Sequence, residues 1–189
     1  MNNTCFFTYV VTKNCNYNCV YCNAHQKEDY LTIDNHLKMC NFLIELSRIK
    51  SKYNYVVMLF GGECTLDPNI NNIINMLSNK ENIELNMFSN FSGDMLIYEK
   101  LCNNPTSKYL HLTWHQNHME LSEYQERLNY LLSRYNNITI SAQCAIGKNR
   151  LTENEIMLKF KPFFKYKNFN ISVFPLHEYD GSENIVDEN

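Results

Sequence analysis

The sequence predicts an α/β fold in which parallel strands alternate with helices. Short β-rich runs recur along the 189-residue chain, amphipathic runs separate them, and the second β-rich run is apolar throughout. An unbroken apolar run is typical of a strand buried on both faces of a parallel sheet. Strands that alternate with helices pair through right-handed crossovers. We therefore expect an open doubly wound sheet or part of a β/α barrel.

The first two strand–helix units occupy the N-terminal part of the chain. Cys5–Val11 is rich in β-branched and aromatic residues and is predicted to form a strand, whereas Ile33–Ile49 has an apolar stripe at helical spacing. Tyr55–Phe60 is the apolar strand. Asp67 precedes a proline, which predicts an N-cap and a helix over Asn69–Leu77.

The next two units follow the same order. Ile83–Ser89 is predicted to be a strand and Asp94–Cys102 a short helix. Tyr109–His115 alternates apolar and polar residues, as a half-buried strand does. A capping-box pattern at Ser122 then predicts a helix that ends at Tyr135.

The last units complete six strands and five helices. Ile138–Ile146 is predicted to be the fifth strand, and a second capping-box pattern at Thr152 begins a helix that continues to about Phe164. Phe169–Leu176 is the sixth strand, and an acidic tail follows at about residues 178–189. Residues 1–189 are expected to form one domain.

Composition narrows the class of protein. The chain is 44% hydrophobic with a net charge of −3, which excludes a disordered chain and argues against nucleic acid as the main partner. It has no basic N-terminal region and no apolar run long enough to span a membrane. We therefore expect a cytoplasmic protein whose cysteines stay reduced or bind metal.

Three of the eight cysteines, Cys15, Cys19 and Cys22, follow the first strand with the spacing C-x3-C-x2-C. Thiolates select zinc, copper(I) or iron–sulfur clusters, and a structural zinc site needs four ligands. His25 as a fourth ligand would give no standard zinc spacing. Three cysteines would leave one iron of a 4Fe–4S cluster open for chemistry.

This spacing after a first strand resembles the radical S-adenosylmethionine (radical SAM) superfamily. The resemblance implies a partial (β/α)6 TIM-like barrel of parallel strands. It also implies that Cys15, Cys19 and Cys22 are the metal ligands and catalytic centre, holding a 4Fe–4S cluster whose open iron binds SAM. In the family an aromatic residue before the third cysteine lies near the adenine, and here that residue is Tyr21.

A glycine pair follows the second strand, in the order Gly61, Gly62 and Glu63. Glycines allow a ligand to approach the backbone, and carbonyl or carboxylate oxygens accept hydrogen bonds from an ammonium group. The sequence resembles the family's GGE(P) motif, which binds the amino group of SAM, although Cys64 replaces the usual proline. We expect Cys64 to be a neutral replacement.

Polar residues at three later strand ends are further candidates. Ser89 and Asn90 match a family position that reaches SAM. His115 shares the polar face of its strand with His111, and His115 is the stronger candidate because it lies nearer the C-terminal end. Gln143 lies on the polar face of the fifth strand and is a candidate contact for cofactor or substrate.

The resemblance implies an enzyme that cleaves SAM reductively to a 5′-deoxyadenosyl radical, which abstracts hydrogen from a substrate. An external electron donor of flavodoxin or ferredoxin type would be its partner. A wide barrel mouth favours a large substrate, such as a peptide, a protein, or a carrier-bound or sugar-containing molecule. Two alternatives remain: a small-molecule enzyme of the pterin or nucleoside type, and a non-catalytic module that binds zinc or a degenerate cluster.

Overall fold

The computed structural model describes residues 3–19, 22, 31–146 and 150–175. Its six strands form one parallel sheet in the order β1-β2-β3-β4-β5-β6. The strands are β1 (Asn3–Thr12), β2 (Tyr53–Gly61), β3 (Ile83–Ser89), β4 (Ser107–Trp114), β5 (Thr139–Ile146) and β6 (Phe169–Pro175). The helices are α1 (Ile33–Ile49), α2 (Ile70–Leu77), α3 (Met95–Cys102), α4 (Leu121–Arg134) and α5 (Glu153–Phe160), with short 3₁₀ turns η1 (Cys64–Leu66) and η2 (Lys161–Phe163).

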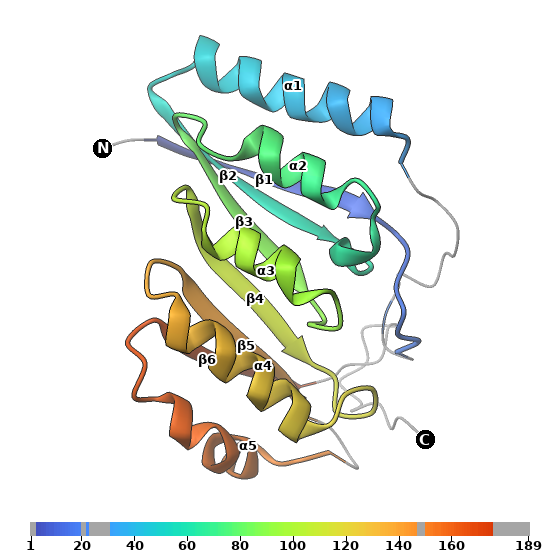
Figure 1. Cartoon of the computed structure of the whole chain (residues 1–189), viewed down its shortest axis with the longest axis vertical. Helices are drawn as coiled ribbons and strands as arrows, with labels where there is room; N and C mark the ends of the chain where they lie inside the picture. The colour runs from blue at the N-terminus through green and yellow to red at the C-terminus, as the bar shows by residue number, and fades with distance from the viewer. Residues whose placement is uncertain (1–2, 20–21, 23–30, 147–149, 176–189) are drawn as a thin grey trace.

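Each strand lies beside the next one in the sequence, and the helices cover a single face of the sheet (Figure 1). A doubly wound sheet would carry helices on both faces, so that alternative is wrong and the partial barrel is confirmed. All carboxyl ends of the strands meet at one edge of the sheet, where β/α folds carry their sites.

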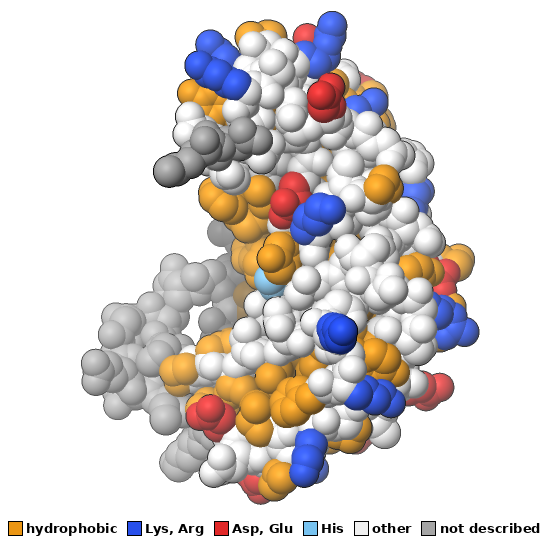
Figure 2. Space-filling view, turned by 90° about the vertical axis from the view of Figure 1, so that its left-hand side faces the viewer, with side chains coloured by type: hydrophobic (Ala, Val, Ile, Leu, Met, Phe, Trp, Pro, Cys, Tyr) orange, Lys and Arg blue, Asp and Glu red, His pale blue; other side chains and the backbone are white. Residues whose placement is uncertain are grey.

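The two faces of the sheet differ in the way the strand alternation predicts. On β4, Leu110, Leu112 and Trp114 are buried under the helices, whereas His111 and Thr113 are only half-buried on the opposite face. That opposite face is the inside of the partial barrel. Figure 2 shows it as a hollow on the left of the molecule, with hydrophobic side chains along its wall.

Helix starts depart from the prediction at two places. Thr152 forms the predicted capping box with Glu155. By contrast, α4 begins at Leu121 without a side-chain cap, so the capping box at Ser122 is wrong. Asp67 ends η1 and accepts a 2.8 Å hydrogen bond from the Asn69 N–H, so the chain makes an extra turn before α2 begins.

Four of the five scattered cysteines (Cys40, Cys64, Cys102 and Cys144) are fully buried in the core. Burial raises the pKa of the Cys64 thiol well above its ordinary value, with Glu63 and Asp67 adding to the shift. Cys64 therefore packs as a small apolar residue, as expected, and is not among the residues that line the cavity described below. In the described ranges, no helix is long and apolar enough to cross a membrane.

Candidate functional site

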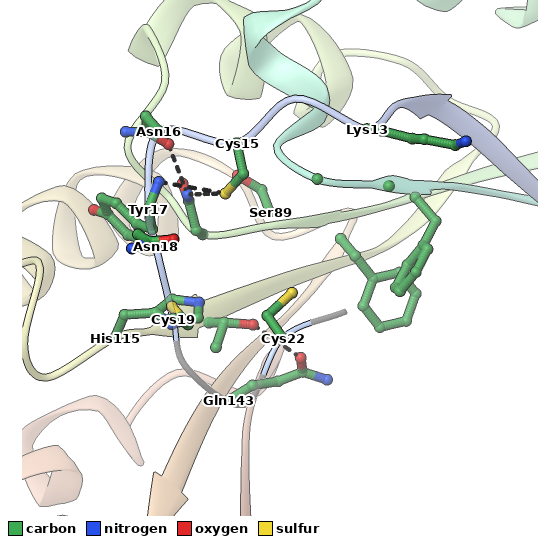
Figure 3. Close-up of a pocket in the computed structure, with 16 residues that line it drawn as sticks. Lys13, Cys15, Asn16, Tyr17, Asn18, Cys19, Cys22, Ser89, His115 and Gln143 are labelled. Atoms are coloured by element: carbon green, nitrogen blue, oxygen red, sulfur yellow. Dashed lines mark hydrogen bonds between the residues drawn. The ribbon is translucent and has the colours of Figure 1, made fainter. Parts of the chain in front are cut away.

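A cavity of about 320 Å³ opens at the carboxyl ends of the strands, where the fold class predicts the site (Figure 3). The loop after β1 forms one side of it and contributes all three clustered cysteines. The ends of β2, β3, β4 and β5 form the other side. Nine of the predicted site residues line this cavity: Cys15, Cys19, Cys22, Gly61, Gly62, Ser89, Asn90, His115 and Gln143.

The cysteine loop presents three thiols of different exposure to this cavity. Cys15 is exposed, Cys22 is half-buried and Cys19 is buried. The Cys22 N–H donates to the Cys19 carbonyl at 3.0 Å, and the Tyr17 N–H donates to the Cys15 sulfur at 3.4 Å. Within the described ranges, no three potential ligands lie close enough to share one metal ion. The fit to an iron–sulfur cluster therefore rests on the all-thiolate donor set and the shared cavity.

His115 follows β4 and contacts the cysteine loop directly. Its Nδ1 lies 3.3 Å from the Cys19 sulfur. Burial, with His118 and Arg150 adding to it, lowers the pKa of His115 to about 4, so the imidazole is neutral at pH 7. The Tyr17 ring stacks on His118 at a centroid distance of 4.5 Å, which holds the loop against the end of β4.

The glycine pair packs directly against the backbone at the start of the cysteine loop. The Gly62 N–H donates to the Thr12 carbonyl at 2.8 Å, and the Glu63 N–H donates to the Asn14 carbonyl at 2.7 Å. A Cβ on Gly61 would lie 2.1 Å from the Thr12 oxygen, and one on Gly62 would lie 2.1 Å from the Asn14 oxygen. Gly61 also has a φ of 141°, which favours glycine. Both positions thus need glycine for close approach of this loop, a reason that the sequence did not reveal.

The Glu63 carboxylate is fully buried and bonded within the protein. One oxygen accepts hydrogen bonds from the Thr65 N–H (3.0 Å), the Thr65 hydroxyl (2.6 Å) and the Ser89 hydroxyl (2.8 Å). The other accepts from the Asn90 N–H at 2.6 Å. The carboxylate thereby ties the end of β2 to the end of β3. A direct contact between Glu63 and the amino group of SAM stays a prediction.

Asn90 links the end of β3 to the cysteine loop. Its side-chain amide donates to Asn16 Oδ1 at 2.9 Å and to the Cys15 sulfur at 3.7 Å (Figure 3). Ser92 closes the same network through a 2.9 Å hydrogen bond from Asn16 Nδ2. Ser89 also lines the cavity, but its hydroxyl donates a hydrogen bond to Glu63. Of the two residues predicted at this strand end, Asn90 is therefore the one that contacts a cysteine.

The remaining predicted residues divide into two groups. Gln143 faces the cavity from β5, and its Oε1 accepts a 3.2 Å hydrogen bond from the Thr113 hydroxyl. Tyr21 and His25 lie outside the described residues, so the predicted adenine contact of Tyr21 stays untested.

Other residues of this cavity were missed from the sequence. Lys13 brings a positive charge to its rim, and Phe60 and Phe88 form an apolar wall beside the glycine pair. The alternation of side chains along β2 and β3 could have identified both aromatic residues, because it places them on the inner face of the sheet. Lys13 and Asn16 belong to an irregular loop, where no periodicity indicates direction.

A comparison with protein families places most of the chain in one of them. The model of the Radical SAM superfamily matches residues 9–145, a range that contains the cysteine loop, the glycine pair and the ends of the first five strands except Ile146. No curated protein sequence matches the chain.

Solved structures of SuiB from Streptococcus suis share the fold. SuiB bound to the precursor peptide SuiA superimposes with a TM-score of 0.66 at 15% identity, covering 100% of this chain and 43% of SuiB. SuiB bound to S-adenosylmethionine gives a TM-score of 0.65 at 14% identity, covering 100% of this chain and 44% of that one. The chain thus spans less than half the length of these proteins, and at such identity the likeness concerns the fold alone.

Proposed function

The chain belongs to the radical SAM superfamily, and from that premise we propose that it modifies a peptide or protein by radical chemistry at the cavity below the cysteine loop. Its cofactors as a superfamily member are a 4Fe–4S cluster and SAM. Within the proposal, residues 1–189 act as one core domain, since the six described strands form a single sheet.

One observation carries the proposal: three thiols and the ends of four strands line the same cavity. When bound, the cluster and SAM supply a 5′-deoxyadenosyl radical that abstracts hydrogen from the substrate. Cys15, Cys19 and Cys22 would hold the cluster. Gly61 and Gly62 line the cavity, and their backbone carbonyls would accept hydrogen bonds from the amino group of SAM. Asn90 would hold the cysteine loop in place through its hydrogen bonds to Asn16 and Cys15.

The size of the cavity supports a large substrate that enters with one part only. Sites for small molecules usually measure about 300–1,000 Å³, and this cavity of about 320 Å³ must also admit the cofactor. A peptide could insert one side chain here while the rest of it lies in the hollow of the sheet (Figure 2). A protein of the same fold, SuiB, has been crystallised with its precursor peptide.

The proposal includes a reducing cytoplasm and an external electron donor of flavodoxin or ferredoxin type. The exposed position of Cys15 supports the latter, because a cluster bound there would lie near the protein surface.

The test is anaerobic reconstitution with iron and sulfide, followed by dithionite and SAM, with 5′-deoxyadenosine measured by mass spectrometry. Wild type and Cys5→Ala should form this product, and Cys22→Ala should not. Both cysteines are half-buried, but Cys5 lies on β1 outside the cavity, so it is a matched control. A wild-type protein that retains stoichiometric zinc and forms no 5′-deoxyadenosine would contradict the proposal.

A further inference from the structure

An aromatic wall continues the cavity along the inner face of the sheet. It consists of Phe60 on β2, Phe88 on β3, and Tyr109 and His111 on β4. The Phe60 and Phe88 rings meet edge to face with centroids 5.5 Å apart, and the Phe88 ring stacks on His111 at 4.3 Å with an interplanar angle of 9°. Tyr109 stacks on His111 at 6.0 Å. Four rings on three neighbouring strands thus form one surface, which is called the aromatic wall below.

This wall is accessible although it is apolar. Phe60 is 44% exposed and Tyr109 is 42% exposed, and Phe60 and Phe88 both border the cavity. The hollow that carries apolar side chains in Figure 2 is the same inner face. Exposed apolar side chains gathered in a concavity are a mark of a ligand-binding surface.

The wall carries no charge at neutral pH. Burial lowers the pKa of His111 below its ordinary value of 6.5, so its imidazole is neutral and stacks as an uncharged ring. An anionic substrate group placed against this wall would lose its hydration without gaining a partner.

The opposite side of the hollow has a different character. Ser141 and Gln143 on β5 and Ser172 on β6 share the inner face, and β-ladder pairing places Gln143 beside Ser172. These side chains are uncharged and can donate and accept hydrogen bonds. The hollow therefore has the aromatic wall on β2–β4 and polar side chains on β5–β6, with the exposed Phe174 at the carboxyl end of β6.

We propose that the aromatic wall seats an aromatic side chain of the peptide substrate, next to the place where hydrogen is abstracted. This inference rests on the proposed function and names the substrate class within it. A ring packed on rings gains edge-to-face or stacked contacts beyond the burial of its area, which an aliphatic side chain of similar size does not. The amide groups of the same peptide find hydrogen-bond partners among the polar side chains on β5–β6.

The experiment compares two probes, the capped tripeptides acetyl-Gly-Phe-Gly-amide and acetyl-Gly-Leu-Gly-amide. Their affinities for the reconstituted full chain with SAM, without reductant, are measured by saturation-transfer NMR titration. Wild type should bind the Phe peptide about two- to tenfold more tightly than the Leu peptide. In Phe88→Leu, and separately in Phe60→Leu, this preference should fall close to one.

Phe42→Leu is the matched control. Phe42 is an exposed phenylalanine on α1, which does not belong to the cavity or the aromatic wall, so this variant should keep the wild-type preference. Equal affinity of wild type for the two peptides would overturn the inference. It would also be overturned if Phe88→Leu and Phe60→Leu weakened SAM binding but kept the peptide preference, because the wall would then serve the cofactor.

Binding is measured without turnover, so these results do not depend on SAM cleavage. A failure to form 5′-deoxyadenosine would contradict the proposed function, whereas equal affinity of the wild type for the two peptides would contradict the inference about the aromatic wall alone.

Discussion

The Glu63 carboxylate and the Asn90 N–H are joined by a 2.6 Å hydrogen bond in the buried interior. The same carboxylate accepts from Thr65 and Ser89, so one acidic side chain fixes the ends of β2 and β3 relative to each other. Since Asn90 also contacts Cys15, this bond connects the glycine pair to the cysteine loop through β3.

Glu63→Gln should destabilise the protein by about 1–3 kcal/mol. The substitution places an amide donor against the donors that the carboxylate now satisfies, either at Asn90 or at Thr65 and Ser89. Urea unfolding of the apoprotein measures the change. The control is Glu45→Gln, which removes an exposed ion pair with Arg48 and should cost less than about 1 kcal/mol. Equal losses in both variants would contradict the role assigned to Glu63.

Gly62→Ala should displace the cysteine loop, because the new Cβ would lie 2.1 Å from the Asn14 carbonyl oxygen. Overpacking of this kind costs about 1–3 kcal/mol, and we expect the reconstituted variant to retain much less iron than wild type. Cys64→Ala, two residues along the chain, is the control and should retain iron as wild type does. Normal iron content in Gly62→Ala would show that the cysteine loop does not require glycine at position 62.

Asn90→Ala should loosen the part of the cysteine loop that carries Cys15, because it removes the hydrogen bonds to Asn16 and to the Cys15 sulfur. Loss of a neutral hydrogen bond costs about 0.5–1.5 kcal/mol, so a chelator should strip iron about three- to tenfold faster. The decay of the visible cluster absorbance measures this rate. Asn103→Ala, at an exposed asparagine that ends α3, should leave the rate unchanged.

Protonation of His111 should destabilise the fold. Burial lowers the pKa of His111 in the folded state below its ordinary 6.5, so below that pH the unfolded chain binds more protons. The free energy of unfolding should therefore fall as pH drops below about 6.5, until the lower folded-state pKa is reached. His111→Phe keeps a stacking ring without the titration, and its pH dependence should be shallower than that of wild type. Parallel curves for the two proteins would contradict a neutral, half-buried His111 in the folded state.

The sequence predicted the six strands alternating with five helices, their parallel pairing and the edge that carries the site. These features depend on local periodicity and on motifs of fixed spacing, such as the three cysteines and the glycine pair. The inner and outer faces of β4 were predicted for the same reason, because alternation along one strand determines them.

The sequence could not reveal contacts between segments far apart in the chain. The need for glycine at positions 61 and 62 comes from the backbone of Thr12 and Asn14, and the burial of the Glu63 carboxylate comes from β3. The capping pattern at Ser122 was misleading because α4 begins at Leu121. Tertiary packing decided each of these features.

The most direct test of the central claim, that the three thiols and the glycine pair serve one cofactor assembly in one cavity, is electron paramagnetic resonance of the reduced, reconstituted protein with and without SAM. We predict that SAM changes the g values of the cluster signal in wild type. In Gly62→Ala, any signal that remains should respond less to SAM. A wild-type signal that is identical in the presence and absence of SAM would contradict the account.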